Sequence, residues 1–187
     1  VTKVHKEVAR LDAQGYQIIM IGHKGHVEVE GTMGQLPEGR MLLVETVEDA
    51  EKVMPDHPDR LAYVSQTTLS VDETKDIIAA LKARFPNIKS PPKDDICYAT
   101  SNRQGAIKEI APQSDLVIVV GSANSSNSVR LKEVALEYGA KRAERVDFAH
   151  QVDESWFEGV ATVGLTSGAS VPEVLVQEVL ALLAEYG

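Results

Sequence analysis

The sequence predicts an α/β fold made of two tandem small α/β domains with mostly parallel sheets. Short apolar runs of strand length alternate with segments of helical periodicity, which is typical of a parallel sheet with helices against its faces. A proline-rich segment at residues 86–92 interrupts this pattern and indicates a boundary between a domain at residues 1–90 and a second at residues 91–187. With 43% hydrophobic residues among 187, the chain can bury two separate cores.

The first domain is expected to open with a helix that ends near Gly15, a residue suited to the left-handed conformation that often follows a helix. The apolar positions that predict this helix are Val1, Val4, Val8 and Leu11. We then expect strands at residues 16–20, 41–44 and 61–65, with helices at residues 47–54 and 71–85. Ser70 and Glu73 fit a capping box at the start of the second of these helices.

The second domain is expected to contain a helix ending near Ile110, then strands at residues 116–120, 142–146 and 160–165. The run at residues 116–120 is apolar throughout, as a central parallel strand should be. Helical spacing follows it at Val129, Leu131, Val134 and Leu136, and a last helix is expected at residues 172–186 with proline in its first turn.

The segment at residues 21–35 follows the first strand and is typical of a polar, glycine-rich loop. Ligands bind beyond the carboxyl ends of parallel strands, so His23, His26 and Glu28 are candidate functional residues. Three interpretations stay open. The segment is a solvated turn whose four glycines adopt positive φ, a metal site of the pattern His-x-x-His-x-Glu, or an acid/base and anion site.

Two further positions have a structural and a functional interpretation. Thr67 and Thr68 lie between a strand and a helix, where hydroxyls either cap the turn or contact a ligand. Cys97 is the only cysteine of the chain. It is either a small buried apolar residue or a reactive thiol, because the start of a helix favours the thiolate.

Residues 121–128 form a small, polar loop between a strand and a helix. Free backbone N–H groups, hydroxyls and the positive end of the helix dipole converge at such a place and can bind an anion without a lysine. The serines and asparagines of this loop could instead serve only as caps. A similar small-residue loop at residues 166–170 brings Ser170 into consideration for the same anion.

Charge and cysteine content narrow the setting. A formal net charge of -9 argues against nucleic acid or an anionic membrane as a partner. No apolar run approaches the roughly 18 residues that span a bilayer, and no signal-peptide pattern opens the chain. A cytoplasmic location is therefore expected, in agreement with the single cysteine.

Five motifs occur in a fixed order along the chain. They are Gly-His-x-Gly-His-x-Glu-x-Glu-Gly-Thr-x-Gly-Gln at 22–35, Gln-Thr-Thr-Leu-Ser at 66–70, Asp-Asp-Ile-Cys-Tyr-Ala-Thr at 94–100, Asn-Ser-Ser-Asn-Ser at 124–128 and Gly-Ala-Ser-x-Pro at 168–172. In this order they resemble the LytB family, the 4-hydroxy-3-methylbut-2-enyl diphosphate reductases. The resemblance covers essentially the whole chain.

The resemblance implies a function. The family removes the allylic hydroxyl of its diphosphate substrate by two-electron reduction, giving isopentenyl and dimethylallyl diphosphate in the last step of the methylerythritol phosphate route to isoprenoids. It uses a 4Fe–4S iron–sulfur cluster and an electron donor such as ferredoxin or flavodoxin. The implied roles are cluster ligand for Cys97, proton relay for Glu28 and proximity to the substrate hydroxyl for Thr67. The implied diphosphate ligands are His26, Ser125, Ser126, Asn127 and Ser170.

The resemblance also implies that part of the site is missing. Family members are trefoil-like enzymes of three domains, and this chain matches the second and third. Two further cluster cysteines, two diphosphate histidines and a C-terminal tail are absent, so the chain alone is expected to be inactive as a reductase. The alternative is a two-domain α/β module that binds a phosphorylated ligand without an iron–sulfur cluster.

Overall fold

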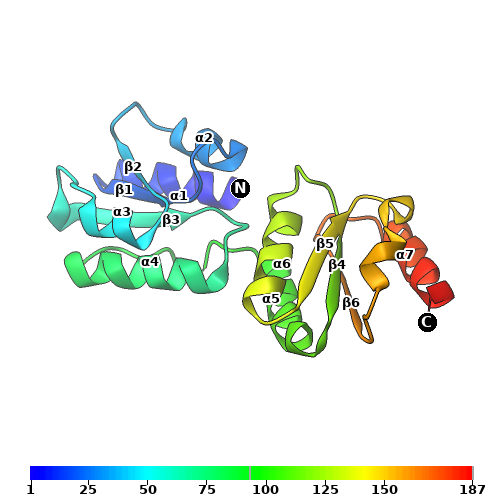
Figure 1. Ribbon diagram of the computed structural model, residues 1–187. Helices are drawn as coiled ribbons and strands as arrows, with labels where there is room; N and C mark the ends of the chain where they lie inside the picture. The colour runs from blue at the N-terminus through cyan, green and yellow to red at the C-terminus, as the bar shows by residue number, and fades with distance from the viewer. Residues whose placement is uncertain (93, 187) are drawn as a thin grey trace. The chain divides into compact units, whose positions relative to one another are not determined.

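The computed structural model describes residues 1–92 and 94–186 (Figure 1). They divide into two compact units, Val1–Cys97 and Tyr98–Gly187, each built on a three-stranded parallel sheet. The predicted α/β class with mostly parallel sheets is confirmed. Cys97 groups with the first unit in this division, whereas the sequence assigns it to the second domain. The predicted domain limits at residues 1–90 and 91–187 stay a prediction.

The first unit has strand order β2-β1-β3, with β1 in the centre. Its elements are α1 (Thr2–Ala13), β1 (Gln17–Ile21), α2 (Val27–Met33), β2 (Met41–Val44), α3 (Val47–Lys52), the short 3-10 helix η1 (Pro58–Arg60), β3 (Leu61–Ser65) and α4 (Val71–Arg84). Ile18 of β1 pairs with Met41 on one side and Ala62 on the other. All five residues of β1 are buried, as a central parallel strand requires.

Helices cover both faces of this sheet (Figure 1). Ile18 and Met20 pack with the buried residues of α1 and α2, whereas Ile19 and Ile21 pack with those of α3 and α4. Burying a side chain of this size stabilises the fold by roughly 1.5–3 kcal/mol. The side chains of the central strand thus alternate between two helical layers, one on each face of the sheet.

The second unit has strand order β5-β4-β6, with β4 in the centre. Its elements are α5 (Tyr98–Ile110), η2 (Ala111–Gln113), β4 (Leu116–Val120), α6 (Ser126–Glu137), β5 (Arg142–Val146), η3 (Ala149–Gln151), η4 (Glu154–Phe157), β6 (Val163–Ser167) and α7 (Glu173–Tyr186). Val117 and Val119 pack against α5 and α6, and Leu116, Ile118 and Val120 pack against α7. Within the described part of the chain, no helix is both long and apolar enough to cross a bilayer.

The segment expected as a loop at residues 21–35 is in part a helix, which corrects the prediction. Residues 27–33 form α2, with His26 at its N-cap and Glu28 and Glu30 in its first turn, where acidic side chains favour a helix start. The solvated-turn interpretation allowed positive φ at four glycines of this segment; among them only Gly25 adopts it, with φ +79°. Gly22 is small for another reason, because a Cβ there would lie 2.6 Å from Val29 Cγ2.

Other limits differ as well. The strand β1 and the helices α4 and α7 are shifted or shortened by one residue, and three differences are larger or have a clear cause. The helix α6 already begins at Ser126, so the polar loop after β4 is shorter than expected. The helix α3 ends at Lys52: Val53 leaves the helical backbone with ψ 135°, and Met54, directly before Pro55, is disfavoured in a helix. The strand β6 runs from Val163 to Ser167, not over residues 160–165. The backbone N–H groups of residues 161 and 162 donate instead to the carboxylate of Asp115, at 2.9 and 3.0 Å.

Candidate functional site

Glu28 and Thr67 form a pair at the carboxyl end of the first sheet. Glu28 lies in the first turn of α2 with 6% of its surface exposed. Its Oε1 accepts a hydrogen bond from the Thr67 backbone N–H at 2.9 Å, and its Oε2 accepts one from the Thr67 hydroxyl at 3.0 Å. A carboxylate held through both oxygens by a single residue has a fixed orientation, which a proton-transfer group needs.

His26 stands next to this pair as the N-cap of α2. Its Nδ1 accepts a hydrogen bond from the Glu28 backbone N–H at 3.1 Å. In a neutral imidazole whose Nδ1 accepts, Nε2 carries the proton and is a donor. His26 therefore combines a structural role, capping α2, with a donor group suited to an anion.

Gln66 holds the turn that leads into this site. Its Oε1 accepts from the backbone N–H of His23 at 3.1 Å, and its Nε2 donates to the Thr68 hydroxyl at 3.0 Å. Gln66 thus connects the end of β1 to the end of β3, and Thr68 takes part in that turn. The sequence analysis missed Gln66, although a glutamine directly after a buried strand is a detectable signal.

Cys97 lies exposed directly before α5 and is tied to Thr67. Its backbone N–H donates to the Thr67 carbonyl oxygen at 3.1 Å. The interpretation of Cys97 as a buried apolar residue is wrong, because its side chain is accessible. Thr67 is therefore bonded to both Glu28 and Cys97, and the structure brings three predicted site residues of the first unit together.

Asp95, two residues before the thiol, is buried and was not predicted as a site residue. Its Oδ2 accepts from the Ser65 backbone N–H at 3.0 Å, and its Oδ1 lies 3.4 Å from Lys3 Nζ. Burial raises the pKa of Asp95, while the Ser65 hydrogen bond and the Lys3 charge act in the opposite direction. A buried carboxylate so close to an exposed cysteine links the first helix, the end of β3 and the segment of Cys97.

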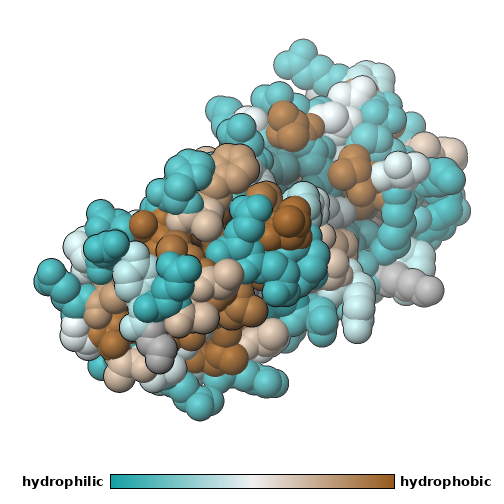
Figure 2. All heavy atoms as spheres, turned by 90° about the vertical axis from the view of Figure 1, so that its right-hand side faces the viewer, coloured by the Kyte–Doolittle hydropathy of each residue, from teal (hydrophilic) through white to brown (hydrophobic). Residues whose placement is uncertain are grey.

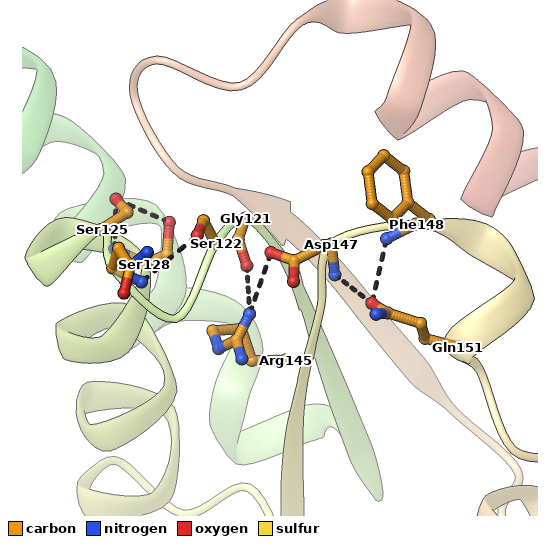
Figure 3. A network of polar contacts seen from close by, with 9 residues as sticks. Gly121, Ser122, Ser125, Ser128, Arg145, Asp147, Phe148 and Gln151 are labelled. Atoms are coloured by element: carbon orange, nitrogen blue, oxygen red, sulfur yellow. Dashed lines mark hydrogen bonds and ion pairs between the residues drawn. The ribbon is translucent and has the colours of Figure 1, made fainter.

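In the second unit, the turn after β4 is held by its own side chains (Figure 3). Ser125, the N-cap of α6, accepts through Oγ from the Ser128 backbone N–H at 3.3 Å and from the Ser128 hydroxyl at 3.0 Å. The Asn124 backbone N–H donates to Ser122 Oγ at 3.2 Å. These are the capping contacts that the sequence left open, so part of this serine-rich loop serves to start the helix.

Arg145 fixes the beginning of the same turn (Figure 3). Its Nη1 donates to the Gly121 carbonyl oxygen at 2.5 Å and to Asp147 Oδ1 at 3.2 Å. Gly121 has φ +153° and approaches Ser128 so closely that a Cβ would lie 2.1 Å from the Ser128 hydroxyl oxygen. The glycine is required by this contact. The role of Arg145 could not be found from local sequence, since it lies on β5.

Asn127 differs from its neighbours in the loop. It has 6% of its surface exposed, and within residues 1–92 and 94–186 neither the oxygen nor the nitrogen of its carboxamide has a hydrogen-bond partner. A buried, unsatisfied carboxamide is costly and calls for a ligand or a bound water. This supports the interpretation of the loop as an anion site beyond simple capping.

Ser125 and Ser170 line one cavity of ≈ 380 Å³ with Ser122, Asp147 and the apolar residues Phe148, Val171, Pro172 and Leu175. Two of the four predicted diphosphate residues of this unit thus come together, and Ser126 lies beside them in the first turn of α6. His23 lies elsewhere, in a cavity of ≈ 390 Å³ with Glu45, Glu73 and Asp76. The expectation that the groups of the two units face one ligand stays a prediction.

Among the residues that the structure describes, no three or more His, Cys, Asp or Glu side chains are grouped so that they could hold a metal ion.

Comparison with known proteins agrees with these observations. A family model described as LytB protein matches residues 1–184. The 4-hydroxy-3-methylbut-2-enyl diphosphate reductase of Neisseria meningitidis is 70% identical over all 187 residues, which cover 58% of that relative, and the one of Leifsonia xyli is 62% identical, with 55% covered. The structure of the Plasmodium falciparum reductase matches 98% of the chain with a TM-score of 0.92 at 40% identity, and 57% of it is covered. The chain thus spans somewhat more than half the length of these relatives.

Proposed function

The chain belongs to the LytB family, and on that premise we propose that a protein of the relatives' full length containing it is a 4-hydroxy-3-methylbut-2-enyl diphosphate reductase. The reaction breaks the allylic C–O bond and forms a C–H bond. It consumes two electrons and two protons and releases the hydroxyl as water. The donor would be a small redox protein such as ferredoxin or flavodoxin. The products would be isopentenyl and dimethylallyl diphosphate.

The observation that carries this proposal is the pair formed by Glu28 and Thr67. Both oxygens of the buried carboxylate are oriented by Thr67. We assign to Glu28 the proton that the leaving hydroxyl needs. The present hydrogen bond runs from the Thr67 hydroxyl to Oε2; once protonated, Oε2 would donate to Thr67 Oγ instead, and the Thr67 hydroxyl would turn its own hydrogen toward the substrate. Departure of hydroxide is costly, so a positioned acid accelerates this step.

The diphosphate would be bound by neutral donors, because the chain as a whole carries a net charge of -9 and a diphosphate has to be attracted locally. The Asn127 carboxamide, the hydroxyls of Ser125, Ser126 and Ser170 and the start of α6 supply such donors in the second unit. His26 Nε2 supplies one in the first unit. The unsatisfied polar atoms of Asn127 support this assignment.

The iron–sulfur cluster fits this chain only in part. A 4Fe–4S cluster needs at least three thiolates when the protein holds it, and the chain contains one cysteine. Cys97 fits one position of the ligand set, since it is exposed at the start of α5. The other thiolates would come from outside these 187 residues. Bound there, such a cluster would pass the two electrons one at a time from the redox donor to the substrate.

A module that binds a phosphorylated ligand without a cluster is the second candidate. The serine and asparagine loop favours it, because the hydrogen bonds between Ser125 and Ser128 and the cavity lined by Ser125 and Ser170 are formed by residues of the second unit.

The test uses the product of the complete gene, purified without oxygen, in the natural form and as Cys97→Ser. We expect the natural protein to contain iron and sulfide and to convert the allylic diphosphate with reduced methyl viologen, and we expect the variant to lose both iron and turnover. Iron-free natural protein that still binds inorganic diphosphate would overturn the reductase proposal in favour of the binding module.

A further inference from the structure

We propose that Asp95 is a positioning residue for Cys97, whose buried carboxylate fixes the thiol-bearing segment against the end of β3 and beside the Glu28–Thr67 pair. The inference rests on the proposed function, since it concerns the placement of the proposed cluster ligand. It assigns no chemical step to Asp95.

Asp95 is buried and makes two contacts, a hydrogen bond from the sheet and an ion pair with the first helix, although its Oδ1 accepts no hydrogen bond within the described residues. Its side chain has 0% of its surface exposed, although it is charged and lies in a connecting segment. One carboxylate oxygen accepts from the N–H of Ser65, the last residue of β3. The other faces Lys3 Nζ of α1 at 3.4 Å, and the same amine donates to the Asp94 carbonyl oxygen at 2.8 Å. The segment is thereby tied both to the sheet and to the first helix.

Cys97 follows Asp95 closely in the chain and is hydrogen-bonded to the candidate site. Two residues further on, the Cys97 N–H donates to the Thr67 carbonyl oxygen at 3.1 Å. Thr67 in turn donates through its N–H and its hydroxyl to Glu28. Asp95 and Cys97 therefore accept and donate hydrogen bonds at two nearby residues, Ser65 at the end of β3 and Thr67 directly after it. Loss of the hydrogen bond between Ser65 and Asp95 should therefore weaken the hydrogen bond between Cys97 and Thr67.

The burial of the Asp95 carboxylate has a free-energy cost. Burying a carboxylate is unfavourable, and an apolar side chain in its place would often be at least as stable. A buried aspartate in a connecting segment therefore indicates a requirement for defined geometry. Its short side chain reaches the Ser65 N–H only when the backbone of residues 94–97 crosses close to the end of β3.

Three substitutions in the 187-residue chain separate positioning from general stability. Asp95→Ala removes the acceptor for Ser65, whereas Asp95→Asn keeps an oxygen there. Asp94→Ala is the matched control, because Asp94 is exposed and contacts Lys3 through its backbone carbonyl. Amide hydrogen exchange by NMR is the readout, and it requires neither cluster nor turnover.

We expect the Cys97 amide to exchange about tenfold faster or more in Asp95→Ala, while amides in the centre of β1 stay unchanged. Asp95→Asn should restore most of the protection, and Asp94→Ala should match the natural chain. Unchanged Cys97 exchange in Asp95→Ala, or equal loss of protection throughout the unit, would overturn the proposal.

If Asp95→Ala does not fold, amide hydrogen exchange of the natural chain at increasing denaturant tests whether Asp95 positions Cys97. With increasing denaturant, the amides of Ser65 and Cys97 should become exposed in the same local opening, and separate openings would contradict the proposal. In the full-length protein, iron per chain should fall in Asp95→Ala and recover in Asp95→Asn. If the exchange result holds while the natural full-length protein lacks turnover, the proposed function fails and the positioning role stands.

Discussion

At the scale of single residues, the candidate site depends on contacts between residues far apart in sequence. Glu28 and Thr67 are joined over 39 positions, and Ser65 and Asp95 over 30. Such pairs leave no local pattern, so the contacts of Asp95 and Arg145 could not be found from sequence, whereas Gln66 directly follows the buried strand β3 and was overlooked. Glu28 was a candidate from its loop and Thr67 from its place between a strand and a helix, while their specific roles came from the resemblance to a family. The structure adds that the two residues hydrogen-bond to each other. The capping role of His26 was missed because histidine is not among the usual N-cap residues.

The residue-scale prediction concerns Glu28→Gln in the full-length protein. Glutamine keeps the size of the side chain but cannot carry the proton, and its NH₂ group would face one of the two donors of Thr67. We expect turnover to fall by about 100-fold to 10,000-fold, as for loss of a positioned acid, with iron content unchanged.

Glu30→Gln is the control for that experiment, because Glu30 lies exposed on the same short helix. It should retain nearly full turnover. A Glu28→Gln protein as fast as the Glu30→Gln protein would show that the proton reaches the substrate by another route.

At the scale of secondary-structure elements, the apolar strands were predictable and the polar element ends were not. The strands β2, β3, β4 and β5 begin and end where the apolar and alternating runs predict. The helix α2 was missed because it has seven residues, contains Gly31 and lacks a usual cap. The strand β6 was displaced because residues 161 and 162 bond to a side chain, Asp115, in place of an extended ladder.

The hydrogen bonds from Ala161 and Thr162 to Asp115 lead to a prediction on stability at low pH. The hydrogen bond from Lys141, helped by the N–H groups of Ala161 and Thr162, lowers the pKa of Asp115 to about 2. A pKa that is lower in the folded chain stabilises the fold above the unfolded value of 3.8, and that contribution disappears as pH falls through about 2. Asp115→Asn should therefore unfold at a lower temperature than the natural chain at pH 7, and the difference should shrink between about pH 4 and pH 2.

Fluorescence of Trp156 is a suitable measurement, because it is the chain's single tryptophan and packs against the core beside α7 in the same unit. Glu178→Gln, a change at an exposed position of α7, is the matched control and should track the natural chain at every pH. If the difference in unfolding temperature between Asp115→Asn and the natural chain stayed constant from pH 7 to pH 2, the proposed contribution of the Asp115 carboxylate would be contradicted.

At the scale of the whole molecule, the chain contains two packed three-stranded sheets, and the second unit exposes apolar side chains on the face of α7. Figure 2 shows apolar side chains gathered on the face of the second unit that carries α7. Val174 and Leu180 of this helix are 60% and 48% exposed. The general architecture followed from sequence because it depends on periodicity, whereas the hydrogen bonds within each candidate site join residues that no local pattern relates.

The central claim is that this chain supplies the acid, one thiolate and part of the anion site of a reductase, with the remaining ligands elsewhere in the full-length protein. Anaerobic reconstitution of the 187-residue chain and of the complete gene product, side by side with iron and sulfide, tests it most directly. Iron per monomer and turnover with reduced methyl viologen are then measured on both. We predict about four irons per monomer and turnover for the complete product, and neither for the 187-residue chain, whose single cysteine cannot hold the cluster in a monomer. A four-iron cluster with turnover in the monomeric 187-residue chain, or a complete product without either, would contradict the claim.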